Sequence, residues 1–209
     1  VPISRVGEAI AAIFVDAAFP APTLREVIEY ARRNPGKLSY STTGIGTTHH
    51  LSGHMIGEMN GINWVHVPYK SGPQAVQDLV AGRTPVSIGT IGTFTGMVQA
   101  GKVRVVAINN NERFSEMPTV PTVGEVLPGY DRPAGWMAYF GPAGLPQPIT
   151  RRLHAEIVKG MNAPEVISVF DKLGLLVETS PSPEQFAVTV RQQYERAGKL
   201  VKAAGIEPE

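Results

Sequence analysis

Residues 38–50 read Leu-Ser-Tyr-Ser-Thr-Thr-Gly-Ile-Gly-Thr-Thr-His-His, a pattern that could bind an anion. A short apolar strand runs here into two glycines, Gly44 and Gly46, just before a helical pattern. The first N–H groups of a helix have no partner inside it, and the helix dipole adds about half a positive charge there. Glycines let the backbone approach a ligand. Neutral hydroxyl donors come from four threonines: Thr42, Thr43, Thr47 and Thr48. We predict that residues 42–48, called the cradle below, bind an anion.

The elements that must position the cradle alternate between strands and helices. Strand patterns occupy residues 37–41, 63–67, 86–91 and 103–108, and helical patterns lie between them. Before them, residues 10–14 read as a buried strand, and Thr23-Leu-Arg-Glu26 gives a capping box that begins a helix. Strands that alternate with helices predict an α/β fold with a mostly parallel sheet and helices on both faces.

Ligands of such sheets bind at the carboxyl ends of the strands. Three loops leave these ends, at residues 42–48, 68–72 and 89–93, so we expect them to meet along one edge. Tyr69 offers a phenol donor and an aromatic wall, and Lys70 offers a positive charge. Two structural alternatives stay open: Lys70 as a solvated surface lysine, and the cradle as a plain tight turn.

A second group of elements follows Asn109-Asn110-Asn111. Prolines punctuate residues 111–133, which we interpret as a crossover between lobes. Further on, a strand is predicted at 136–140, then a helix that carries Ile149, Leu153 and Ile157, a second helix at 163–173, and a strand at 175–178. A last helix begins after Ser182, with Phe186 and Val190 on its apolar stripe.

Composition excludes several classes of function. The chain has 209 residues, with 19 Lys+Arg against 18 Asp+Glu, so no basic excess suggests nucleic acid or anionic lipid. The absence of cysteine excludes disulfides, thiolate zinc sites and a cysteine nucleophile within these residues. No apolar stretch approaches the ~20 residues that a membrane-spanning helix needs.

Enzyme and metal motifs are also incomplete. The Gly44–Gly46 pattern lacks the third glycine of a dinucleotide fingerprint and the lysine of a P-loop. His50 and His54 are four residues apart, but the glutamate of a metalloprotease helix is missing between them. No Gly-x-Ser-x-Gly elbow is present. We therefore predict no catalytic residue, no metal and no cofactor.

An ordered set of motifs resembles the Bug family, the solute receptors of tripartite tricarboxylate transporters. These motifs are residues 38–51, Val-His-Val-Pro-Tyr-Lys at 65–70, Asp-Leu-Val-Ala-Gly at 78–82, Ala-Gly-Lys-Val-Arg at 100–104, Pro-Thr-Val-Pro-Thr at 118–122, Trp136, Gly-Pro-Ala-Gly at 141–144 and Ala-Ala-Gly-Ile at 203–206. The resemblance covers nearly the whole chain. It implies a periplasmic, two-lobed, non-enzymatic receptor that closes on a small carboxylate in an interlobe cleft and delivers it to the membrane subunits of a transporter.

Carried over by position, the family's contacts fall on Thr42, Thr43, Gly44, Gly46, Thr47, Thr48, Tyr69 and Lys70. The histidine of the family matches His50 rather than His49. Two positions depart from the family pattern: Ile45 replaces a common asparagine, and Gly89 with Thr90 replaces a frequent acidic residue. We add Thr90 to the predicted contacts.

The resemblance also predicts the domains. Residues 9–110 match a complete lobe, the second of the receptor. Residues 1–8 and 111–209 match a crossover and the C-terminal part of the first lobe. Family members carry an N-terminal section ahead of these residues, and Val1-Pro2-Ile3 reads like the interior of a longer precursor without its signal peptide. An incomplete lobe would expose strand edges and favour a homodimer or strand exchange. Two other readings stay open: a sensor or assembly protein that binds solute weakly or not at all, and a hydrolase or lyase of small acids.

Overall fold

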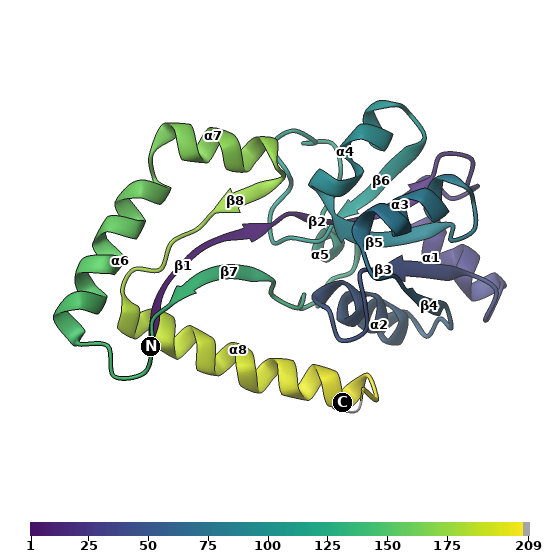
Figure 1. Ribbon diagram of the computed structural model, residues 1–209. Coiled ribbons are helices and arrows are strands. Elements are labelled where there is room, and N and C mark those ends of the chain that lie inside the picture. Colours follow the sequence, from purple (N-terminus) through teal and green to yellow (C-terminus); the bar gives the residue numbers. More distant parts are fainter. Residues whose placement is uncertain (207–209) are drawn as a thin grey trace. The chain divides into compact units, whose positions relative to one another are not determined.

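The computed structural model describes residues 1–206 and divides them into two compact units (Figure 1). Unit 1 comprises Val1–Ala9 and Ala134–Ala203, and unit 2 comprises Ile10–Pro133 and the described residues that follow Ala203. The proline-punctuated residues 111–133 thus group with unit 2. The two units are described separately.

Unit 2 contains a five-stranded sheet with the order β4-β3-β5-β2-β6. The strands are β2 (Ala11–Asp16), β3 (Ser39–Thr42), β4 (Val65–Pro68), β5 (Val86–Thr90) and β6 (Val103–Ile108). Strand β3 pairs in parallel with β4 and β5, whereas β2 pairs antiparallel with both β5 and β6. Four strands therefore point the same way, and the predicted α/β fold with a mostly parallel sheet is confirmed. Strand β2 is the exception, because it follows β1 after a single residue and no crossover helix precedes it.

Helices cover both faces of this sheet, as predicted. The helices are α1 (Leu24–Arg33), α2 (Thr48–Asn60), α3 (Gly72–Val80), α4 (Ile91–Gln99) and the short α5 (Val123–Val126). Side chains of β2 alternate between two cores: Ile13 belongs to the core that includes residues of α1, α2 and α5, and Phe14 to the one beneath α3 and α4. The Phe14 and Phe94 rings stack with their centroids 3.9 Å apart, which fixes α4 on the second face.

Helix starts in unit 2 follow their capping residues. Thr23 and Glu26 form the predicted capping box of α1. Thr122 and Glu125 form a second one at α5, a helix that lies within the proline-punctuated segment and was not predicted. The Arg113 guanidinium and the Thr122 backbone N–H hold the pKa of the Glu125 carboxyl well below its usual range, at about 2.

Unit 1 is built around a three-stranded antiparallel sheet with the order β7-β1-β8. Its elements are β1 (Pro2–Ala9), β7 (Trp136–Phe140), α6 (Gln147–Met161), α7 (Pro164–Lys172), β8 (Leu175–Val177) and α8 (Pro183–Ala203). Phe186 of α8 is buried and contacts the rings of Trp136 and Phe140 on β7. None of the helices described in residues 1–206 combines the length and the apolar character of a membrane-spanning segment.

Candidate functional site

The carboxyl ends of the parallel strands meet along one edge of unit 2. The Tyr69 N–H donates to the Thr42 carbonyl oxygen at 2.9 Å, which joins the cradle to the loop at 68–72. A Cβ added to Gly72, at the start of α3, would lie 2.8 Å from Cγ2 of Thr93 in the first turn of α4, so these two helix starts are in contact. The three loops predicted to converge are therefore neighbours.

A fourth loop, at residues 109–111, lies at the same edge. Strand β6 runs parallel to β5, and the Asn109 N–H donates to the Ala11 carbonyl oxygen at 2.7 Å. The buried Asn109 amide also donates to Ser52 on α2 and accepts a hydrogen bond from the Tyr130 hydroxyl, both at 2.9 Å. Sequence reasoning treated this asparagine triplet only as a boundary, although polar residues directly after a buried strand were a usable signal.

The cradle backbone is open at its glycines. Gly44 has φ +134° and Gly46 has φ +73°, and no atom lies within 4 Å of a Cβ added to Gly46. Helix α2 begins at Thr48, so the N–H groups of Thr48 and His49 have no acceptor inside the helix. The cradle therefore presents the free donor end of a 13-residue helix beside an open loop.

Two of the four threonine hydroxyls are used inside the cradle. Thr47 is the N-cap of α2: its hydroxyl donates to the Gly44 carbonyl oxygen at 2.8 Å and accepts from the His50 N–H at 3.2 Å. The buried Thr42 hydroxyl contacts Gly44 and lies 2.7 Å from Nε2 of His66. The hydroxyl of the exposed Thr43 lies 3.4 Å from Nδ1 of His49, and Thr48 is half-buried. Thr42 and Thr47 thus shape the loop, and the side chains of Thr43 and Thr48 are the more accessible to solvent.

Neutral histidine side chains contact the cradle through its backbone and its threonine hydroxyls. The Gly46 N–H donates to Nδ1 of His50 at 3.1 Å, so the proton of the neutral His50 ring is on Nε2. The His50 ring stacks on that of His66, with centroids 3.8 Å apart. Burial lowers the pKa of His66 to about 4, and the neighbouring His50 lowers it as well. Burial and His54 also lower the pKa of His50, and burial lowers that of His49 to about 4. At neutral pH the donors of the cradle are therefore uncharged.

The other predicted contact residues, Tyr69, Lys70 and Thr90, differ in whether their polar groups already bond within the chain. The Tyr69 hydroxyl donates to Oδ2 of Asp78 at 2.6 Å, and burial followed by this bond raises the pKa of the phenol. The phenol proton is therefore used within unit 2. Lys70 is exposed, with no hydrogen bond or ion pair to any other residue of the described chain. Thr90 is the N-cap of α4, and its half-buried side chain makes no capping bond.

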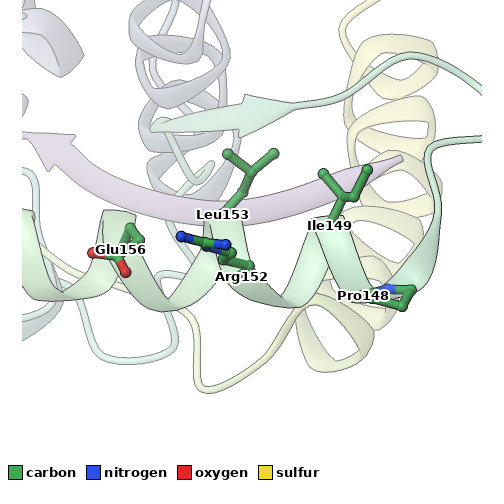
Figure 2. A pocket seen from close by; sticks show the side chains of 5 residues that line it. All are labelled: Pro148, Ile149, Arg152, Leu153 and Glu156. Carbon is green, nitrogen blue, oxygen red and sulfur yellow. The ribbon is translucent and has the colours of Figure 1, made fainter.

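A pocket of about 460 Å³ lies elsewhere, along helix α6 of unit 1 (Figure 2). It is lined by Pro148, Ile149, Arg152, Leu153 and Glu156. None of the predicted contact residues belongs to it, and all five lining residues come from one helix. Within residues 1–206, no group of three or more His, Cys, Asp or Glu side chains could hold a metal ion.

Several solved structures share this fold. An R. palustris protein solved with adipate is 26% identical, with a TM-score of 0.87 over 100% of this chain and 69% of its own. The periplasmic binding protein BugD is 30% identical, with a TM-score of 0.81 over 100% of this chain and 70% of its own. MatC from Rhodopseudomonas palustris with bound malate is 26% identical, with a TM-score of 0.79 over 96% of this chain and 69% of its own.

Curated relatives match the chain over most of its length. A UPF0065 protein of Pseudomonas sp. is 34% identical over 180 residues, 85% of this chain and 53% of its own length. A UPF0065 protein of Bordetella pertussis is 27% identical over 208 residues, 100% of this chain and 64% of its own length. The chain thus spans between half and two thirds of these relatives. Residues 1–206 match the model of the tripartite tricarboxylate transporter family receptor, and the chain therefore belongs to this family of solute-binding receptors, which are not enzymes.

Proposed function

We propose that the chain binds a small carboxylate at the cradle, as part of a receptor that delivers the solute to the membrane subunits of a tripartite transporter. The observation that carries this proposal is the free N-terminus of α2, set between open glycines and accessible hydroxyls at an edge that also holds Lys70. One carboxylate group of the ligand would accept hydrogen bonds from the N–H groups of Thr48 and His49.

The charges around the cradle support an anionic ligand. The Asp78 carboxylate, the acidic group nearest the loop at 68–72, accepts hydrogen bonds from Tyr69 and Arg83. The three histidines of the site are neutral at pH 7, because their pKa values are lowered. Lys70 therefore supplies the positive charge of these loops. The bound adipate and malate of the two R. palustris proteins support a dicarboxylate as the ligand class.

We expect unit 2 alone to bind such a ligand weakly. A helix N-terminus contributes roughly 0.3 to 2 kcal/mol to the binding of an anion, whereas micromolar affinity needs about 8 kcal/mol. Full affinity would need further donors and the exclusion of water. Binding by this chain is therefore expected to be weak, or to require an assembly.

NMR titration with adipate and malate tests the proposal, with the neutral diamide of adipic acid as the ligand control. Lys70→Gln should weaken dicarboxylate binding several-fold. Lys37→Gln is the matched control, because Lys37 is also exposed but precedes β3 at the opposite edge of the sheet. Equal binding of the acid and its diamide would refute carboxylate recognition. Micromolar binding by a strictly monomeric chain would refute the expectation of weak affinity.

The cellular setting follows from the same proposal. Receptors of this family are periplasmic, and we propose the periplasm for this chain too. Co-purification with transporter membrane subunits, with and without dicarboxylate, would test the delivery step. If the chain co-purified with the membrane subunits equally well without dicarboxylate and without Lys70, this result would argue against solute delivery.

Exposed apolar side chains of unit 1 favour a second candidate function, an assembly role. These side chains are Val1, Met137, Tyr139, Phe140, Ile149, Leu153, Ile167, Val169, Leu173, Leu176, Val188 and Tyr194. Where such side chains form one contiguous patch, they mark an interaction site. Light scattering after size-exclusion chromatography would show a homodimer or strand-exchanged species under this proposal. A monomer at all concentrations would remove it.

A further inference from the structure

His66 contacts the cradle from the neighbouring strand. It lies on β4, opposite Tyr40 of β3, and no motif argument gave it a role. Its ring is stacked on His50 at 3.8 Å between centroids and contacts the Tyr40 ring at 5.1 Å. Both neighbouring rings thus limit how the His66 side chain can turn.

His66 contacts Thr42 and His50, which lie before and after Gly44 and Gly46 of the cradle. Its Nε2 lies 2.7 Å from the Thr42 hydroxyl, where β3 ends and the loop begins. Its ring supports His50, whose Nδ1 accepts the Gly46 N–H at 3.1 Å after the loop has turned. His66 therefore connects the entry and the exit of the loop without being part of it.

The other hydrogen bonds around Thr42 indicate which group donates in the bond between Thr42 and His66. The Gly44 carbonyl oxygen already accepts the Thr47 hydroxyl proton at 2.8 Å, a shorter bond than the 3.2 Å from Thr42. The Thr42 proton is better placed on Nε2 of His66, while the Thr42 oxygen accepts the Gly44 N–H at 3.3 Å. In this arrangement Nε2 of His66 is the acceptor that orients Thr42, and Thr42 in turn holds Gly44.

We propose that His66 is a positioning residue, which fixes the shape of the cradle through Thr42 and through the ring of His50. It touches the loop's supports rather than the ligand. The inference rests on the proposed function, because the cradle shape matters for affinity only if the cradle binds the carboxylate.

Three variants test this inference by NMR titration with adipate. His66→Phe keeps an aromatic ring for stacking and removes the partner of Thr42, so affinity should fall about fivefold, the factor for one hydrogen bond of about 1 kcal/mol. His66→Gln restores a polar group near the position of Nε2 and should recover most of the loss. His54→Gln is the matched control, since His54 lies on α2 but makes no hydrogen bond to the cradle. It should bind like the unmodified chain.

Hydrogen exchange of the Gly46 amide provides a readout that needs no ligand. His50 accepts this amide proton only while the loop keeps its shape, so His66→Phe, which removes the partner of Thr42 at the start of the loop, should speed the exchange several-fold, whereas His54→Gln should not. If His66→Phe does not fold, Thr42→Val removes the same bond from the other side. Unchanged affinity and unchanged Gly46 exchange in the folded variant would overturn the inference. If no variant binds adipate but Gly46 exchange responds as expected, the proposed function fails and the positioning role stands.

Discussion

Two glycine-to-alanine substitutions in unit 2 should change stability in opposite directions. Gly53 is buried in α2, and a Cβ added there would lie 2.6 Å from Cζ and 2.9 Å from the hydroxyl oxygen of Tyr40. Tyr40 is 2% exposed and contacts the Trp64 ring at 4.5 Å, so it has little room to move away. Gly96 lies inside α4, and no atom is within 4 Å of its added Cβ.

The magnitudes follow from two opposing effects. Alanine is more favourable than glycine inside a helix by about 1 kcal/mol. Overpacking a well-filled core costs about 1–3 kcal/mol. Gly96→Ala should therefore raise the free energy of unfolding by up to about 1 kcal/mol, and Gly53→Ala should lower it by about 1 kcal/mol, a difference of about 2 kcal/mol.

Urea unfolding followed by tryptophan fluorescence measures both effects in one transition. The chain has two tryptophans, Trp64 in unit 2 and Trp136 in unit 1. A Trp136→Phe background leaves Trp64 as the reporter, and Nε1 of Trp64 donates to the Gly53 carbonyl oxygen at 3.1 Å. If Gly53→Ala were as stable as Gly96→Ala, the close packing of α2 on β3 inferred from Tyr40 would be wrong.

Three further predictions concern the cap, the histidines and the core. Thr47→Val removes the α2 cap and the bond to Gly44, and should lower the free energy of unfolding by about 1–2 kcal/mol in urea denaturation, while Thr47→Ser should keep most of it. Because the pKa of His66 falls to about 4 on folding, the unfolded chain binds its proton first. The contribution of neutral His66 to stability is fully present above about pH 6.5 and is lost as the pH falls toward 4. His66→Gln should therefore show a smaller drop in unfolding free energy between pH 7 and pH 4.5 than the unmodified chain. Phe94→Ala removes the ring stacked on Phe14 and should cost about 3–5 kcal/mol, and a cost below 1 kcal/mol by the same measurement would contradict the packing of α4.

Periodicity was sufficient to predict most elements, because their apolar faces are complete. Strands 103–108 and 136–140 were predicted with the bounds that the structure has, as was the capping box of α1. Strand β1 was missed because Arg5 and Glu8 interrupt its apolar pattern. Their charges are paired within unit 1, where Arg5 bridges Glu8 and Glu178, and a pairing over that sequence distance leaves no local signal.

The candidate site shows a similar limit. The glycines, threonines and Lys70 could be named from their positions at strand ends, and their roles as ligand contacts stay predictions. The hydrogen bond from the Tyr69 hydroxyl to Asp78 could not be predicted from the sequence, because it depends on the direction of the Tyr69 side chain rather than on residue type. His66 was missed for the same reason: it becomes relevant only when β4 is placed beside β3.

The internal bonds of Thr42 and Thr47 hold the shape of the cradle without a ligand. Because the loop is held by its own hydroxyls and histidines, the entropy of ordering it is lost during folding and not during binding. The exposed side chains of Ile45 and Lys70 make no hydrogen bond that holds the loop, and Ile45 is 64% exposed. If the cradle binds the solute as proposed, exchanges at Ile45 and Lys70 would alter which solute it accepts and leave the scaffold of the loop unchanged.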